Sequence, residues 1–408
     1  MLISGQESTL PCSVSVRSRL YGGLRIYTSS YKSYSVSMRQ RKAHYEDLRE
    51  SVLAKLERTE VVLSVVAMPD FFLDHSLTCD FDARILTRRM LSVASRGGGE
   101  MSDIPQSLEV GGNAAICTLA LAKLGANVHP MMKTDALGLL LMRYFYEAST
   151  VDLSRIKLTG SLSPTTILEL RNRNGSTNIM LGDSSSIRPF GFEDLDSEDL
   201  ATIDRTRYVC VFDWLYNKKG TDLAEKVFGY CRTNSRARTF FDASDPGPRL
   251  KELPELNRRV LRNGLIDFWG VNENEALIFG KLYTRKLRRR GGNIALEAGK
   301  VISANSGAKV YLHTADYSAS IREDQVTLVP AFAVPLRRST GAGDSWNAGI
   351  MVADALRLTE EEELLFANAV AGRYASSPQR VYSTIREMAE FLKSSALRLK
   401  RTRHVERL

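Results

Sequence analysis

The chain has 408 residues, of which 43% are hydrophobic and 25% charged, a balance typical of a globular protein of one large or two modest domains. No apolar run approaches the roughly 20 residues that a transmembrane helix needs, which excludes a membrane-spanning helical protein. The formal net charge of +9 favours anionic partners, including phosphorylated metabolites and nucleic acid. The five cysteines are scattered, so we expect free thiols in a reducing compartment and a cytoplasmic protein. The histidines show no metal-ligand spacing, and no zinc site is expected.

The two ends of the chain differ in composition from its middle. Residues 1–58 are predicted to form a poorly ordered basic extension and a short lead-in helix at 41–58, where Leu48, Val52 and Leu56 lie at helical spacing. The acid-poor, serine-rich beginning is also typical of a transit peptide, and Met38 is an alternative start. We expect the main domain at 59–394 and a frayed basic tail at 395–408.

Apolar runs and helical patterns alternate along the main domain. The β-branched run at 61–67 predicts a strand buried on both faces, as in a parallel sheet. Further strands are predicted at 208–212 and 238–241, with a helix at 221–231 between them. This alternation predicts an α/β fold with a doubly wound sheet, whose ligands bind at the carboxyl ends of the strands.

A glycine pair, Gly111-Gly112, opens a helix of small residues and is followed by Asn113. Glycines let the backbone approach a ligand closely, and an asparagine side chain offers donors and acceptors to hydroxyl groups. Close helix packing is the alternative, but it explains the alanines that follow rather than the glycines. We therefore interpret Gly111, Gly112 and Asn113 as candidate substrate contacts.

Two alternating runs at 164–182 flank Asn174-Gly175, which predicts a β-hairpin. Arg171 and Arg173 lie beside the turn. An arginine there can hold a substrate phosphate in a bidentate manner, and Arg171 is the candidate. The alternative is a solvated hairpin edge protected by charge.

The most informative stretch is 339–349, where Gly341, Ala342 and Gly343 run into Asp344 and a helical pattern begins. Uncovered N–H groups at a helix N-terminus form a pocket for an anion such as a phosphoryl group. A carboxylate beside an anion pocket is unfavourable unless it removes a proton from a hydroxyl that attacks the phosphoryl group. The alternative is an ordinary loop with Asp344 as helix N-cap.

This stretch resembles the C-terminal signature of the ribokinase-like carbohydrate kinases, the PfkB family, which reads roughly Asp-Thr-x-Gly-Ala-Gly-Asp-x-Phe-x-x-Gly. Trp346 stands for the phenylalanine, and Arg338 replaces the leading acid, which puts a monovalent-cation site in question. The glycine pair resembles the N-terminal signature Gly-Gly-x-x-x-Asn. The usual asparagine falls at Ile116, so Asn113 is the candidate substitute.

The resemblance assigns roles to residues elsewhere in the chain. An acid after the first strand binds sugar hydroxyls in this family, and Asp74 matches it; a surface turn acid is the alternative. Asn272 and Glu275 match an Asn-x-x-Glu whose acid helps to hold Mg²⁺, often through water, the alternative being a capping acid in a helix first turn. Thr314, in a nucleotide-lining turn, and Asn368, in an Ala-Asn-Ala helix beside the adenine, are the expected nucleotide contacts.

The resemblance implies a ribokinase-like three-layer α/β fold, with a mostly parallel sheet and a small β lid formed by strands around 160–185. It implies a kinase that transfers a phosphoryl group from ATP, with Mg²⁺, to a hydroxyl of a sugar, nucleoside or sugar phosphate. Asp344 would be the general base and the amides of 341–344 the anion hole. ADP as donor stays open because the turn at Thr314 departs from the usual pattern. Lid strands in this family often pair between subunits, so a homodimer is a further expectation.

Two rival functions remain open. The departures at Ile116, Arg338 and around Thr314 permit a non-catalytic ligand-binding protein on the same fold, although the retained Asp344 argues against it. The basic stretch 281–290 would suit nucleic acid, but neither interleaved aromatic residues nor a groove-reading motif accompanies it, so nucleic acid is not the expected partner.

Overall fold

The computed structural model describes residues 38–147, 149–172, 175–285, 287, 293–377, 379, 381–394 and 398–400. Its centre is an eight-stranded sheet with the order β12-β11-β10-β9-β8-β7-β1-β4. Neighbouring strands from β4 to β10 are parallel, and β11 and β12 add antiparallel pairs, which confirms the mostly parallel sheet. The strands are β1 (Ser64–Met68), β4 (Asn127–Pro130), β7 (Tyr208–Val211), β8 (Arg238–Phe241), β9 (Phe268–Asn272), β10 (Lys309–His313), β11 (Tyr317–Arg322) and β12 (Gln325–Pro330).

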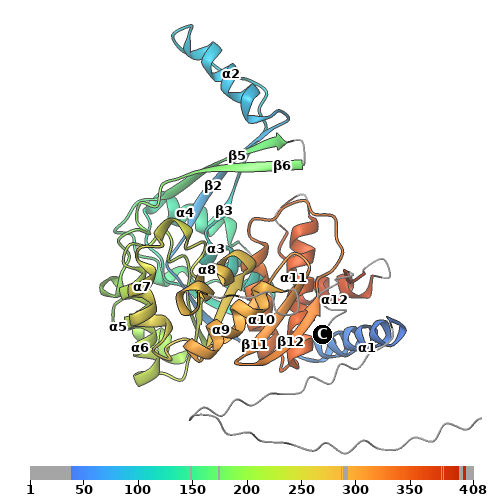
Figure 1. The fold of residues 1–408 in the computed structure, drawn as a ribbon. Coiled ribbons are helices and arrows are strands. Elements are labelled where there is room, and N and C mark those ends of the chain that lie inside the picture. Colours follow the sequence, from blue (N-terminus) through green and yellow to red (C-terminus); the bar gives the residue numbers. More distant parts are fainter. Residues whose placement is uncertain are drawn as a thin grey trace, which may run out of the picture.

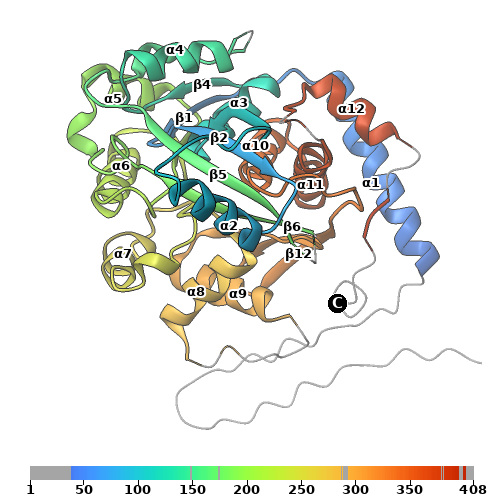
Figure 2. The ribbon, with the colours of Figure 1, turned by 90° about the horizontal axis from the view of Figure 1, so that it is seen from above.

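Helices cover both faces of this sheet, which gives the expected three layers (Figure 2). Successive strand residues point to opposite faces, so Val65 and Cys210 join one apolar core and Val66 and Val209 the other. On the first face lie α1 (Met38–Arg58), α3 (Asn113–Lys123), α4 (Ala136–Phe145), α10 (Ala342–Ala355), α11 (Glu360–Ser376) and α12 (Ile385–Lys393). On the second lie α5 (Ser197–Arg205), α6 (Gly220–Asn234), α7 (Leu253–Leu256), α8 (Glu273–Tyr283) and α9 (Ile294–Ser306).

A smaller sheet projects from the main body as a lid (Figure 1). Its order is β3-β2-β5-β6, with β2 (Phe72–Cys79), β3 (Gln106–Gly111), β5 (Ser163–Asn172) and β6 (Gly175–Gly182). The hairpin predicted at 164–182 forms β5 and β6, whereas Arg173 and Asn174 lie outside the described residues. No local pattern in the sequence predicted β2, β3 or the helix α2 (Ala83–Ala94), which extends from the far end of the lid.

Several boundaries differ from the predictions. The first strand begins at Ser64 rather than at 61, because its neighbour β4 begins opposite Ser64 and the ladder has no earlier partner. The lead-in helix α1 begins earlier than predicted, at Met38. It is fastened to α11 by hydrogen bonds of 2.5 Å from Ser51 and from Lys55 to Glu362.

Residues 1–37 and most of the predicted basic tail lie outside the described part of the chain. Within that tail, Leu399 forms an antiparallel bridge with Phe332. No helix among the described residues is both long enough and apolar enough to cross a membrane.

Candidate active site

Helix α10 begins at the glycine-rich stretch that the sequence singled out. Gly341 is its N-cap, with a φ of 85° that residues with side chains rarely adopt. A Cβ at Gly341 would collide with the hydroxyl of Tyr374, which donates a 3.0 Å hydrogen bond to the carbonyl of Thr340. Both the turn and the close contact therefore require glycine at this position.

The first turn of α10 exposes backbone donors. The N–H of Ala342 donates to the carbonyl of Ser339, at 3.2 Å. The N–H groups of Gly343 and Asp344 have no acceptor within the described chain. Two free donors at the positive end of a fourteen-residue helix can bind an anion.

The Asp344 side chain lies beside these donors. Only 8% of the residue is exposed, and its carboxylate forms neither an ion pair nor a hydrogen bond with any described residue. Because Gly341 is the N-cap, the structure excludes the alternative in which Asp344 caps the helix. The carboxylate therefore keeps its lone pairs available to accept a proton.

Four further acids gather around Asp344, each from the carboxyl end of a parallel strand. They are Asp70 after β1, Asp213 after β7, Asp242 after β8, and Glu275 in the first turn of α8 after β9. None of the four is more than 5% exposed, and none is ion-paired to a described lysine or arginine. Burial makes the largest contribution to the pKa of Asp344, and the charges of these four acids add to it, so that this pKa lies well above its usual range. The sheet has thus brought five carboxylates to one edge.

The repulsion within this cluster is considerable. Burial, with a smaller contribution from the charge of Asp242, raises the pKa of Asp70 to about 7. Burial also raises the pKa of Asp213, Asp242 and Glu275. Five such groups cannot all be ionised unless cations or hydrogen-bond donors join them. The cluster is therefore suited to a ligand that brings positive charge or donors.

The glycine pair packs directly against two acids, Asp70 of this cluster and Asp74 of the lid strand β2. A Cβ at Gly111 would overlap the carboxylate of Asp74, and one at Gly112 would overlap that of Asp70. Gly112 has a φ of 94° and caps α3, whose Ala114 N–H donates a 3.1 Å hydrogen bond to Asp70. The glycines therefore let two acids approach the start of α3, where the predicted contact Asn113 is the first helical residue.

The predicted metal ligand Glu275 takes part in a capping box. Its two carboxylate oxygens accept hydrogen bonds from the N–H and the side-chain amide of Asn272, at 2.9 and 2.6 Å. No group of three or more His, Cys, Asp or Glu residues in the described chain has the geometry of a metal site. Glu275 is buried beside Asp242, and a hydrated cation bound there would reduce the repulsion between the two carboxylates.

The side chains of the two predicted nucleotide contacts, Thr314 and Asn368, form hydrogen bonds with other residues of the protein. The Thr314 hydroxyl accepts hydrogen bonds from the N–H groups of Asp316 and Tyr317, and it donates to the Tyr317 carbonyl. The Asn368 amide accepts from the Trp346 indole at 2.9 Å and donates to the Pro330 carbonyl at 3.1 Å. The structure therefore gives both side chains a role in shaping the site rather than an open position in it.

His313, which was not predicted as a site residue, lies against the glycine-rich stretch 341–344 at the start of α10, which we call the anion loop. A Cβ at Gly343 would lie 2.9 Å from the His313 ring, whose centroid is 5.3 Å from that of Trp346. Burial lowers the pKa of His313 to about 4, so the ring is neutral at physiological pH. It forms one wall of the loop.

Arg171 is not brought to the cluster. Thr165 on β5 is opposite Asp74 of β2. Arg171 lies six residues further along β5, which corresponds to about 20 Å along a strand. Arg338, the departure from the family signature, is instead paired with Glu109 at 3.4 Å. Glu109 lies opposite Asp74 on the neighbouring strand, so Arg338 links the lid to the anion loop.

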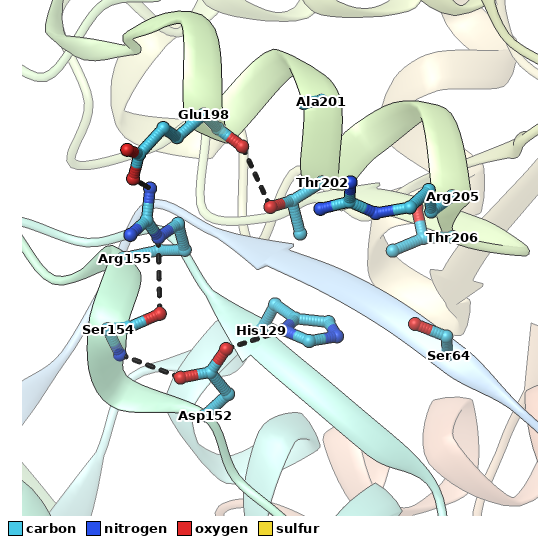
Figure 3. A pocket seen from close by; sticks show the side chains of 10 residues that line it. All are labelled: Ser64, His129, Asp152, Ser154, Arg155, Glu198, Ala201, Thr202, Arg205 and Thr206. Carbon is cyan, nitrogen blue, oxygen red and sulfur yellow. Dashed lines mark hydrogen bonds and ion pairs between the residues drawn. The ribbon is translucent and has the colours of Figure 1, made fainter.

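A cavity of about 340 Å³ lies at the other edge of the sheet (Figure 3). Its lining includes Ser64, at the start of β1, and Arg205, at the end of α5. Two of its lining residues, His129 and Asp152, interact through Nδ1 and Oδ2 at 3.1 Å. Because this cavity is at the amino end of β1, it is separate from the acids that follow the carboxyl ends of the strands.

Asp70, Asp213, Asp242 and His313 were missed as site residues. Each ends a strand of the parallel sheet or lies within two residues of its carboxyl end, and this position was the available signal. It was not sufficient, because polar residues also end strands for structural reasons, and the strand order that makes these residues neighbours is not visible in the sequence.

The fold and site together define an α/β protein with a β lid, a helix N-terminus that can bind an anion, and a buried carboxylate beside it. The family model described as pfkB family carbohydrate kinase matches residues 105–383, and the chain belongs to this family. No curated protein matches the chain.

Solved structures share the ribokinase-like fold. A PfkB family carbohydrate kinase from Listeria grayi is 14% identical with a TM-score of 0.63, over 81% of this chain and 100% of that one. The adenosine kinase from Sinorhizobium meliloti is 18% identical with a TM-score of 0.61, over 81% and 99%. The Arabidopsis thaliana ribokinase complexed with ribose and ATP is 17% identical with a TM-score of 0.60, over 83% and 100%.

Proposed function

We propose that this protein is an ATP-dependent kinase that phosphorylates a hydroxyl group of a sugar, a nucleoside or a sugar phosphate. The observation that carries the proposal is the Asp344 carboxylate, which is buried, unpaired within the described chain, and adjacent to two free N–H groups of α10. A proton acceptor and an anion site at the same point are what phosphoryl transfer to an alcohol requires.

In the proposed reaction, Asp344 accepts the proton of the acceptor hydroxyl as its oxygen attacks the γ-phosphorus. A bond forms between that oxygen and phosphorus, the bond from the γ-phosphorus to the bridging oxygen breaks, and ADP leaves. The N–H groups at the start of α10, from Gly341 to Asp344 as predicted and above all those of Gly343 and Asp344, stabilise the charge on the moving phosphoryl group. Asp74, Gly111, Gly112 and Asn113 position the acceptor.

Mg²⁺ is the proposed metal cofactor, because it usually keeps several waters and binds one or two carboxylates together with substrate phosphates. When bound, it would neutralise charge on the donor phosphates. Glu275 would hold it through water, since the amide and N–H of Asn272 already occupy one lone pair on each oxygen. Burial, with a smaller contribution from the charge of Asp242, raises the pKa of Glu275, and a cation bound beside Glu275 would offset this effect.

The proposal is tested with a matrix of acceptors and donors. Ribose, fructose, adenosine, cytidine, fructose 6-phosphate and ribose 1-phosphate are each incubated with ATP, ADP or GTP and Mg²⁺, and phosphorylated product is measured by mass spectrometry. We expect product with ATP and one acceptor class. If product formed with ADP but not with ATP, ADP would be the donor. Ligand binding without any product would favour a non-catalytic binding protein.

Replacing Gly111 with alanine is expected to raise the KM for the acceptor about 10- to 100-fold, because the new Cβ displaces Asp74 and removes a charged hydrogen bond. The fold should survive, since the collision is with the end of a side chain. Gly229→Ala is the control: it lies in α6 with nothing within 4 Å of the new Cβ. An unchanged acceptor KM in Gly111→Ala would remove Asp74 from the acceptor site.

We also propose that the protein is cytoplasmic and that it forms a homodimer through the lid. The lid presents exposed apolar side chains on neighbouring strands, Leu108 at 56%, Ile179 at 44% and Leu181 at 60%. Together with Leu77 and Leu168 they share one face of the lid sheet. Light scattering should give twice the chain mass, and Leu181→Asp should reduce it to the monomer; a monomeric wild type would contradict the dimer.

A further inference from the structure

The cavity at the amino end of β1 is built from two sides (Figure 3). Ser64 of β1, His129 of β4 and the short helix η1 (Leu153–Arg155) line one side. Helix α5 lines the other with four residues at positions i, i+3, i+4 and i+7, which share one face of a helix: Glu198, Ala201, Thr202 and Arg205. Its volume of about 340 Å³ is within the range of small-molecule pockets, about 300–1,000 Å³.

The two acids of the lining already have partners. Asp152 accepts a 2.9 Å hydrogen bond from the N–H of Ser154, and its second oxygen interacts with Nδ1 of His129. Glu198 is ion-paired with Arg155 at 2.5 Å. A ligand in the cavity would therefore meet no carboxylate of the lining that lacks a partner.

Three side-chain groups of the lining have no partner in the described chain. The Arg205 side chain is exposed, and its guanidinium forms neither a hydrogen bond nor an ion pair with a described residue. The Ser64 hydroxyl forms no hydrogen bond with a described residue either, and Figure 3 shows neither group in an interaction among the residues drawn. Because Nδ1 of His129 interacts with Asp152, Nε2 is the ring nitrogen left for a ligand. Guanidinium, hydroxyl and imidazole groups together are suited to an oxyanion.

We propose that this cavity is a second ligand site, which binds a small molecule through a phosphate or carboxylate group. Arg205 pairs with the anionic group, the Ser64 hydroxyl donates a hydrogen bond to it, and Nε2 of His129 contributes a further hydrogen bond. The site lies at the amino end of β1, whereas Asp344 lies with the acids at the carboxyl ends of the strands. The proposal is therefore independent of the proposed kinase function.

Other classes of ligand fit this lining less well. A metal ion would lie near the charge of Arg205, and no group of three or more His, Cys, Asp or Glu residues in the described chain has the geometry of a metal site. A neutral sugar would leave the Arg205 guanidinium without a counter-charge. An oxyanion supplies that charge and acceptors for the other two groups.

Calorimetric titration of the full chain at constant ionic strength tests the proposal. The probes are inorganic phosphate, glycerol 3-phosphate and glycerate, and glycerol is the neutral comparison. We expect an anionic probe to bind wild type, and Arg205→Gln to weaken that binding about 10- to 100-fold, because a charge-assisted hydrogen bond is lost. Ser64→Ala should weaken it about 2- to 10-fold, the effect of a neutral hydrogen bond. Tighter binding of the phosphate probes or of glycerate identifies the anionic group.

Arg143→Gln is the matched control. Arg143 and Arg205 both lie in the last turn of a helix, α4 and α5, and both are exposed, but Arg143 does not line the cavity. Either substitution removes one positive charge and a favourable interaction with the helix dipole, so a general charge effect predicts equal losses of affinity. A loss in Arg205→Gln that is absent from Arg143→Gln supports the proposed site.

Several results would overturn the proposal. They are binding of none of the anionic probes, glycerol binding as tight as theirs, or equal losses in Arg205→Gln and Arg143→Gln. An unchanged affinity in Arg205→Gln would place the bound anion elsewhere, for example at the anion loop of α10. In the proposed kinase reaction, Arg205→Gln should keep the kcat and both KM values of wild type; a raised KM for ATP would assign Arg205 to the donor site instead.

Discussion

Replacing Asp344 with asparagine is expected to lower kcat by about 10²- to 10⁴-fold, the usual cost of removing a positioned general base. Asparagine has nearly the same shape but does not accept the proton of the attacking hydroxyl. The fold should be retained, because the carboxylate makes no hydrogen bond or ion pair within the described chain whose loss would destabilise it. Initial rates of ADP formation, with nucleotide and acceptor binding by calorimetry, measure the effect.

Asp354→Asn is the matched control, since Asp354 belongs to the same helix but lies near its other end. It is ion-paired with Arg207 at 2.5 Å and with Arg238 at 2.8 Å, so its loss should reduce stability without a comparable loss of kcat. Near-normal turnover in Asp344→Asn, with wild-type turnover in the control, would refute the general-base assignment.

Replacing Asp70 with asparagine is expected to stabilise the protein at pH 8 and to remove part of its pH dependence. Burial raises the folded-state pKa of Asp70 from 3.8 to about 7, so the folded protein holds this proton more tightly than the unfolded chain. This contribution to stability is present below about pH 4 and is lost as the pH rises to about 7. A pKa change from 3.8 to about 7 corresponds to up to about 4 kcal/mol.

Chemical denaturation between pH 4 and 8 tests this expectation, and Asp354→Asn again provides the contrast. Burial raises the pKa of Asp354, but the Tyr208 hydroxyl, Arg207 and Arg238 together lower it below its usual value. Its stabilising contribution is therefore present at neutral pH and lost on acidification. If wild type and Asp70→Asn had parallel stability profiles, the carboxyl would be ionised in the folded protein at all these pH values.

Local patterns were enough to predict the parts of this fold whose structure depends on near neighbours in the chain. Continuous apolar runs predicted parallel strands, and the alternating run at 164–182 predicted the hairpin of β5 and β6. The small residues at 341–343 predicted a bare helix N-terminus, because the absence of side chains is itself a property of the sequence. The lid was predicted only in part, since the residues of β2 and β3 satisfy no local pattern without their partners.

By itself, then, the sequence determined the class of fold, the anion loop and Asp344, all of which depend on neighbouring residues along one helix or strand. Only the tertiary structure decided that Asp70, Asp213, Asp242 and Glu275 meet at that loop, because strand order places residues up to 205 positions apart at one sheet edge. It also decided that Thr314 and Asn368 are hydrogen-bonded internally and that Arg171 is distant. Burial and mutual repulsion, which shift the pKa values of these acids, arise only when the chain has brought them together.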